Sequence, residues 1–224
     1  MVILFAVSCV MLISFLGGVS LKLMERDYII LNMIYRFGFC FGRHVAFLAN
    51  FPSARTCDRR LKLLVDNGYL FRKKVLYGLP YLYYLTKDGM RLIHVTPRDE
   101  SIRVDKIHHD MTVLDCLPYF IKHYGFTFDT MTTERELHCK DGFGVRQHHP
   151  DIVFQKDGES FAIEFELSKK ATVRLIHNIE QNYLNYDVQI WVIPASQSGI
   201  LNILTSSLEK YDSIEVMTLE SLLS

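Results

Sequence analysis

Apolar residues in the first part of the chain recur at helical spacing and then alternate with polar ones, which predicts helices followed by strands. Ser53 is a good N-cap for the third helix, and Thr86 can cap the helix that follows the strands. The predicted elements are helices over 26–37, 42–48 and 53–65, strands over 69–75 and 81–85, and a helix from Lys87. Three helices followed by a hairpin predict a winged helix-turn-helix arrangement.

In the second part of the chain, helical and extended patterns alternate. The predicted elements are helices over 102–124, 171–186 and 200–210, strands over 126–136, 188–193 and 214–217, a hairpin around 157–158 and a closing helical turn at 219–223. Pro118 should kink or end the first of these helices. The expected fold is α/β (α+β), with a winged helix at 24–95, a polar linker at 96–103 and a mixed-sheet domain at 104–224.

The dipeptide Asp157-Gly158 predicts a tight hairpin, because both central positions of a type I′ turn need positive φ. A two-residue loop pairs Lys156 with Glu159 and, counted outward, sets Asp151 opposite Glu164. Side chains alternate along a strand, so Glu166 lies on the same face as Glu164. Three carboxylates, Asp151, Glu164 and Glu166, are therefore expected to converge.

Opposed like charges destabilise a strand pair, so these carboxylates need a cation or a proton. Oxygen ligands suit hard divalent ions, and Mg²⁺ or Mn²⁺ is the expected cofactor, with Asp151, Glu164 and Glu166 as ligands. The alternative is that Glu164 and Glu166 form the solvated face of an ordinary edge hairpin. Val153 and Ala162 make this face partly apolar, which favours the metal site.

The formal net charge is zero, but the charges are divided unevenly along the chain. Residues 24–95 hold twelve Lys or Arg against five Asp or Glu, a charge of +7, while residues 96–224 hold twelve against twenty, a charge of −8. The basic part is expected to meet a polyanion, although a basic helix can also be merely solvated. The candidate DNA-binding residues on the third helix and the wing are Ser53, Arg55, Thr56, Arg59, Arg60, Arg72, Lys73 and Lys74.

The first residues of the chain form an uncharged apolar run over 2–19. It can be read as a membrane anchor, a secretory signal or a translated leader ahead of a start at Met24, and we favour the last. Five cysteines without a CxxC pair suit buried thiols in a reducing compartment. The expected location is therefore cytoplasmic, with membrane contact only if the leader is retained.

The segment from Pro150-Asp151 through Glu164-Phe165-Glu166 to Lys169 resembles the PD-(D/E)xK nuclease core. The usual pattern has lysine two places after the acidic residue, and Glu166 in that place is similar to the E-x-E variant of some restriction enzymes. The resemblance implies a restriction-endonuclease-like domain and catalytic roles for Asp151, Glu164, Glu166 and Lys169, with Glu166 or Lys169 activating water. Accessory roles are assigned to His109, Glu134 and His149.

The order of parts resembles the replication-relaxation family and the plasmid mobilisation relaxases within it. The segments that carry this resemblance are 59–61, 67–70, 84–89, 109–115, 133–137 and 150–169. The resemblance implies site-specific binding and nicking of double-stranded DNA at a plasmid or mobile-element origin, with other mobilisation proteins as partners. Two alternatives stay open: a DNA-binding accessory or regulatory protein whose nuclease-like domain has lost activity, and, if the leader is retained, a membrane-tethered DNA-binding protein.

Overall fold

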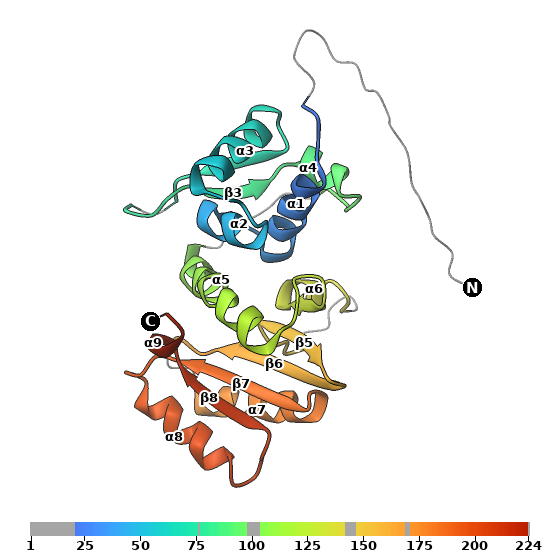
Figure 1. Ribbon diagram of the computed structural model, residues 1–224. Coiled ribbons are helices and arrows are strands. Elements are labelled where there is room, and N and C mark those ends of the chain that lie inside the picture. Colours follow the sequence, from blue (N-terminus) through green and yellow to red (C-terminus); the bar gives the residue numbers. More distant parts are fainter. Residues whose placement is uncertain (1–20, 76, 98–103, 142–146, 169–170, 224) are drawn as a thin grey trace, which may run out of the picture.

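The computed structural model describes residues 21–75, 77–97, 104–141, 147–168 and 171–223 (Figure 1). This part of the chain is a mixed α/β protein with two sheets, one of three strands and one of five. Among these residues, no helix combines the length and the apolar character needed to cross a membrane. The expected α/β class is therefore confirmed at this level, while the apolar run at 2–19 lies outside the described residues.

The first unit consists of short helices around a small antiparallel sheet. Its elements are α1 (Glu25–Phe37), β1 (Cys40–Phe41), α2 (Gly42–Leu48), α3 (Ala54–Asp66), β2 (Leu70–Lys73), β3 (Leu82–Leu85) and α4 (Lys87–Leu92). Strands β2 and β3 form a hairpin, and β1 extends the sheet along β3. The predicted caps are confirmed: Ser53 Oγ accepts a hydrogen bond from the Thr56 backbone N–H, and Thr86 Oγ1 accepts one from that of Gly89.

The core of the first unit is formed by the apolar faces of α1 and α3 against the sheet. Ile30, Ile34, Leu61 and Leu64 are fully buried there, as helical spacing requires. Residues 21–23 also belong to this unit, because Leu21 and Leu23 pack against the same core. The first unit thus begins before the boundary that was expected at residue 24.

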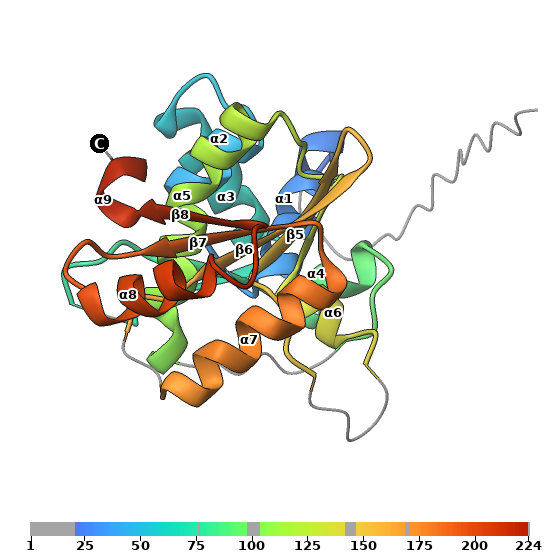
Figure 2. The same ribbon diagram turned by 90° about the horizontal axis from the view of Figure 1, so that it is seen from below.

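The second unit is a five-stranded sheet with helices on both faces. Its elements are α5 (Val104–Tyr124), β4 (Met131–Thr133), α6 (Glu134–His138), β5 (Ile152–Lys156), β6 (Glu159–Phe165), α7 (Thr172–Asn185), β7 (Val188–Ile193), α8 (Ser198–Ser207), β8 (Ile214–Thr218) and α9 (Leu219–Leu222). The strand order is β4-β5-β6-β7-β8, antiparallel as far as β6 and parallel from β6 to β8. Helix α5 lies on one face, and α7 and α8 cover the other (Figures 1 and 2).

The predicted hairpin is confirmed in its turn and in its register. Asp157 and Gly158 both have positive φ, 52° and 89°, as a type I′ turn demands. Lys156 pairs with Glu159, and the pairing continues to Ile152 opposite Ile163. The hairpin does not lie at the edge of the sheet, however, because β6 is its central strand.

One predicted strand in the second unit is wrong. Residues 126–136 do not form one strand, because Thr133 Oγ1 accepts a hydrogen bond from the Glu136 N–H while the Glu136 carboxylate accepts one from the Thr133 N–H. This capping box ends β4 and starts α6. The predicted helix that reaches Tyr124 is confirmed as α5, and Pro118 lies inside it without ending it.

Helix α7 turns only part of its predicted apolar stripe toward the sheet. Ile179 is fully buried as predicted, whereas the side chains of Val173 and Leu184, which helped to predict the helix, are 81% and 73% exposed. Besides Ile179, the buried side chains of α7 are Leu175, Asn178 and Asn182. The helix therefore brings two amides into the interior of the protein.

Helix α5 packs against both units, although the sequence assigns it to the second unit alone. Ile107 and Leu114 belong to the core of the first unit, whereas Cys116 and Phe120 belong to the core of the second. Side chains of α2 also reach α5 directly. Asp115 forms a bidentate ion pair with Arg43, with oxygen–nitrogen distances of 2.7 and 2.8 Å, and its Oδ1 lies 2.9 Å from His44 Nε2.

A buried arginine on α1 forms a second link between the units. The Arg36 guanidinium donates to the backbone carbonyls of Phe128 and Met131, and its Nε lies 2.9 Å from Glu136 Oε1. Thr133 Oγ1 donates in return to the Arg36 carbonyl. These bonds tie the end of α1 to β4 and α6.

Candidate functional site

The central carboxylate of the predicted site belongs to Glu164. This residue lies on β6, and its side chain is buried under α7. Its side chain lies on the face of the sheet that carries Trp191, which is paired with Glu164 in the neighbouring strand. Asn182 Nδ2 donates to Glu164 Oε1 at 3.2 Å, and His148 Nε2 lies 2.6 Å from the same oxygen. Burial raises the pKa of Glu164, and the neighbouring Asp151 carboxylate raises it further, while His148 and Asn182 oppose this shift.

Asp151 lies immediately before β5 and is tied to two elements. Its Oδ2 accepts a hydrogen bond from the Phe165 N–H at 2.8 Å and lies 3.5 Å from His109 Nε2 on α5. His109 Nδ1 lies 3.1 Å from Asp110 Oδ1. Burial lowers the pKa of His109, but hydrogen bonds and charge attraction from Asp110 and Asp151 outweigh that effect and raise the pKa to about 11. His109, predicted as an accessory residue, therefore acts as a cation beside Asp151.

The expected convergence of three carboxylates is not what the structure contains. Glu164 and Glu166 are only 5% and 2% exposed, so the alternative of a solvated hairpin face is wrong. Yet Asp151, Glu164 and Glu166 do not form a group with all ligand atoms within 4.8 Å of one another. Glu166 follows the end of β6, where its N–H donates to the Val192 carbonyl, so it continues the pairing with β7. Lys169 lies outside the described residues.

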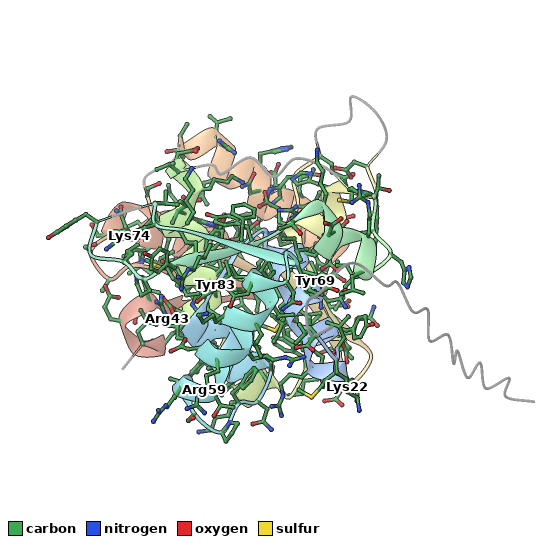
Figure 3. All side chains as sticks on the ribbon, turned by 90° about the horizontal axis from the view of Figure 1, so that it is seen from above. Lys22, Arg43, Arg59, Tyr69, Lys74 and Tyr83 are labelled. Carbon is green, nitrogen blue, oxygen red and sulfur yellow. The ribbon has the colours of Figure 1, made fainter. Side chains whose placement is uncertain are left out.

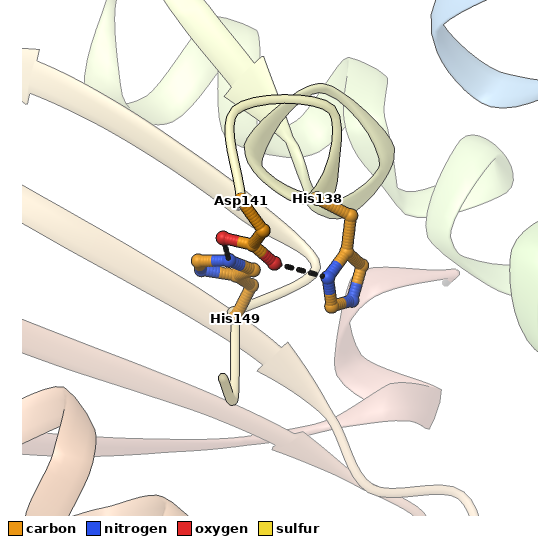
Figure 4. A group of neighbouring side chains, drawn as sticks. All are labelled: His138, Asp141 and His149. Carbon is orange, nitrogen blue, oxygen red and sulfur yellow. Dashed lines mark hydrogen bonds and ion pairs between the residues drawn. The ribbon is translucent and has the colours of Figure 1, made fainter. Parts of the chain in front are cut away.

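Two histidines and an aspartate form a second polar cluster beside the first (Figure 4). Asp141 Oδ2 lies 2.9 Å from His138 Nδ1, and Asp141 Oδ1 lies 2.8 Å from His149 Nε2. Hydrogen bonds from these histidines lower the pKa of Asp141. Glu134, a predicted accessory residue, lies between Lys106 Nζ, at 3.4 Å, and His138 Nε2, at 3.5 Å. Among the described residues, His138, Asp141 and His149 are the group whose ligand atoms lie within 4.8 Å of one another.

The predicted DNA-binding residues divide into exposed and engaged side chains. Arg60 is engaged: it forms a two-point ion pair with the fully buried Asp27 and donates to the Lys22 carbonyl, which makes it a poorer candidate for a DNA contact than the exposed cations. The ion pair with Asp27 also raises the pKa of Arg60. Ser53 and Thr56 are exposed but serve the cap of α3, with their hydroxyl oxygens 2.9 Å apart.

The other predicted basic residues lie at the surface of the first unit. They are Arg55, Arg59, Arg72, Lys73 and Lys74, all of which are exposed. Arg72 stacks on Tyr81, with its guanidinium carbon 4.8 Å from the ring centroid. Arg72 and Lys62 also line a cavity of about 520 Å³ between α3 and the hairpin.

The predicted site does not include the two side chains that contact the buried carboxylate, His148 and Asn182. A signal for Asn182 is present in the sequence, because Asn178 and Asn182 are four residues apart on a helix and therefore lie on one face. The prediction of buried thiols is confirmed for Cys40, Cys57 and Cys116, which form no disulfides. It is wrong for Cys139, which is exposed.

Comparison with known proteins adds no relative from which a function could be carried over. No family model matches the chain, and no curated protein is significantly similar to it. The functional argument therefore rests on the residues of this chain.

Proposed function

We propose that the chain is a winged-helix DNA-binding protein whose second unit, a restriction-endonuclease-like domain, nicks double-stranded DNA by metal-dependent phosphodiester hydrolysis. The observation that carries the proposal is the buried carboxylate of Glu164 on β6, whose pKa is raised by the charge of Asp151, the residue just before β5. Burying a carboxylate is costly without a compensating cation or proton, so this arrangement points to a role in chemistry.

The DNA-binding part of the proposal is supported by the exposed cations of the first unit. Figure 3 views this unit from the side opposite to the five-stranded sheet, and Arg43, Arg59 and Lys74 lie along one side of the view. Arg55 and Arg59 lie four residues apart on α3, so both can reach the same groove of a duplex. Lys73 and Lys74 at the end of β2 suit contacts with the phosphate backbone.

The chemical part of the proposal assigns a role to each acid. Carboxylates on adjacent strands fit a hard divalent cation, and Mg²⁺ or Mn²⁺ held by Asp151 and Glu164 would polarise the scissile phosphate. Asn182 orients Glu164 through its hydrogen bond. His109 lies between Asp110 and Asp151 and would hold the Asp151 carboxylate in place. Glu166, or Lys169, would position or deprotonate the attacking water, as the resemblance to the nuclease core implies.

The nicking activity is tested on supercoiled plasmid that carries the replication or transfer origin of a mobile element. Incubation with the full chain and Mg²⁺ or Mn²⁺ should produce open circles. Asp151→Ala should abolish nicking while DNA affinity stays unchanged, and Asp212→Ala, a change of an exposed acid in the same unit, should leave both intact. Full nicking by Asp151→Ala would remove this carboxylate from the mechanism.

DNA binding is tested by its salt dependence. Because each phosphate contact contributes about 0.9 to the slope of log affinity against log salt, the double change Arg55→Ala/Arg59→Ala should lower the slope by roughly 2 if both residues contact phosphates. Arg174→Ala, which removes an exposed cation from α7, is the matched control. An unchanged slope in the double variant would exclude α3 as the DNA-contacting helix.

A second candidate function is a DNA-binding accessory or regulatory protein without nuclease activity. It is favoured by the histidines that already face both acids, His109 at Asp151 and His148 at Glu164, since these can replace a metal as the compensating groups. The two candidates differ in the plasmid experiment: the accessory protein shifts the mobility of the plasmid DNA without opening the circles.

A further inference from the structure

The cluster of His138, Asp141 and His149 brings ligand atoms together from two segments of the chain. His138 ends α6 and Asp141 follows it closely, whereas His149 comes from the stretch that leads into β5 (Figure 4). The two imidazole rings lie edge to face with centroids 4.7 Å apart, and each presents a nitrogen to a different oxygen of Asp141. Three potential ligand atoms thus face a common point.

We propose that His138, Asp141 and His149 form a binding site for a borderline transition-metal ion, with Zn²⁺ as the reference ion. Two imidazoles with one carboxylate suit Zn²⁺ and similar first-row ions, whereas Mg²⁺ prefers oxygen ligands alone. Ligand atoms about 2 Å from a shared ion lie roughly 3 to 3.5 Å from one another. The nitrogen–oxygen distances of 2.8 and 2.9 Å run to two different oxygens of Asp141, and one ligand atom from each of the three residues lies within 4.8 Å of the other two.

The surroundings of His138 supply an independent reason to expect a metal ligand. Glu134 Oε1 lies 3.5 Å from His138 Nε2, and Glu134 is itself held by Lys106. A carboxylate beside one ring nitrogen of a metal-ligating histidine orients the ring. Glu134 is placed to do this at His138 Nε2, while Nδ1, which hydrogen-bonds to Asp141, would give up its proton on binding the ion.

This site is distinct from the carboxylates proposed for nicking. Consecutive residues serve different acids, since His148 faces Glu164 and His149 faces Asp141. One backbone hydrogen bond links the two places, from the Glu134 N–H to the Asp151 carbonyl at 3.0 Å. An ion at the histidine site would fix the segment that leads into Asp151. Zn²⁺ binding at the histidine site therefore does not depend on nuclease activity at the carboxylates.

The test is calorimetric titration of Zn²⁺ into the full chain, purified without a polyhistidine tag and stripped with a chelator. We expect one equivalent to bind. Replacing a group that orients a metal-ligating histidine typically weakens binding about 10- to 100-fold, so Glu134→Gln should fall in that range and His138→Ala or His149→Ala should lose more. His177→Ala, which removes an exposed histidine from α7, should bind Zn²⁺ like the unchanged protein.

Thermal unfolding provides a second readout on the same proteins. Zn²⁺ should raise the melting temperature of the unchanged protein and of His177→Ala, but not that of His138→Ala or His149→Ala. The metal-free melting temperatures show whether each variant is folded, and His138, whose side chain is 44% exposed, is replaceable without loss of core packing. The proposal is overturned if the unchanged protein takes up no Zn²⁺, or if both single histidine variants bind it with unchanged affinity.

Discussion

Helices α3 and α7 have similar lengths and both carry an apolar stripe, but they present opposite kinds of face to the protein. In α3 the stripe is buried through Leu61 and Leu64, and the cations lie outside. In α7 two stripe residues, Val173 and Leu184, are exposed, while Asn178 and Asn182 point inward. The difference follows from what each helix covers: α3 packs on an apolar core, whereas α7 also covers a buried carboxylate that needs hydrogen-bond donors.

This comparison shows where amphipathic patterns predict orientation and where they do not. A buried polar group must be hydrogen-bonded, and leaving Glu164 without Asn182 costs more than exposing an apolar side chain on a helix surface. A helix that faces a polar site can therefore turn amides inward. Which side chains such a helix buries is therefore evidence about the polar site that the helix covers.

The largest effect is expected from a matched pair of leucines. Leu61→Ala on α3 should lower the free energy of unfolding by about 2–5 kcal/mol, because it leaves a cavity in a closed core. Leu184→Ala on α7 should change it by less than about 0.5 kcal/mol, since this side chain is mostly exposed. Urea unfolding of both variants measures the difference. Equal losses would mean that α7 buries its apolar stripe after all.

The two neighbouring arginines of α3 sharpen the contrast between its faces. Arg60→Ala strands the buried Asp27 carboxylate and should cost about 3 kcal/mol, the lower end of the range for a broken buried ion pair because Arg60 keeps some exposure. Arg59→Ala removes an exposed cation and should stay within about 0.5 kcal/mol. Unfolding midpoints test stability, and the salt slope of DNA binding should respond only to Arg59.

The role of the inward amides of α7 is tested by a double-mutant cycle. Asn182→Ala should cost about 1–3 kcal/mol, because Glu164 loses a buried hydrogen-bond donor. In a Glu164→Ala background the same change should cost less, giving a coupling of about 0.5–3 kcal/mol. Asn185→Ala, an exposed amide on the same helix, is the control. Additive losses would separate Asn182 from Glu164.

The smallest effect concerns the ion pairs that join α2 to α5. Burial raises the pKa of Asp115, but His44 and Arg43 outweigh it and lower the pKa to about 2. A carboxyl group whose pKa is lower in the folded state stabilises the protein above its unfolded pKa and loses that contribution as the pH falls toward 2. Allowing for partial exposure, Asp115→Asn should cost about 1–2 kcal/mol at neutral pH.

Denaturant unfolding at several pH values checks this sign. The difference between the unchanged protein and Asp115→Asn should shrink below about pH 4, where the unfolded carboxyl begins to take up a proton. A difference that grows as the pH falls from about 4 toward 2 would contradict the assignment.

Local signals in the sequence were sufficient for most elements and for the hairpin. Ser53 and Thr86 cap helices as predicted, and Asp157-Gly158 sets the register that brings Glu164 beside Asp151. These features depend on residues close together in the chain, where hydrogen-bonding geometry and allowed φ values decide the outcome. The capping box of Thr133 and Glu136 was equally local and readable, but the apolar pattern of 126–136 was given more weight.

The candidate site was predictable only in part, because it depends on tertiary partners. The sequence indicates that the carboxylates share a face, but not that His109 from α5 and His148 from the preceding loop would meet them. It also treats Arg60 as equivalent to Arg59, since the buried Asp27 that distinguishes them lies on α1. Long-range pairing of charges cannot be derived from spacing along one helix.

The placement of α5 has a practical consequence for truncation. A fragment that stops at residue 95 would lack Ile107 and Leu114, which complete the apolar interior of α1 and α3. Such a fragment would expose an apolar patch to solvent. It would also lose the ion pairs that Arg43 and His44 form with Asp115. Isolation of the first unit therefore calls for a cut beyond Tyr124 rather than within 96–103, the predicted linker.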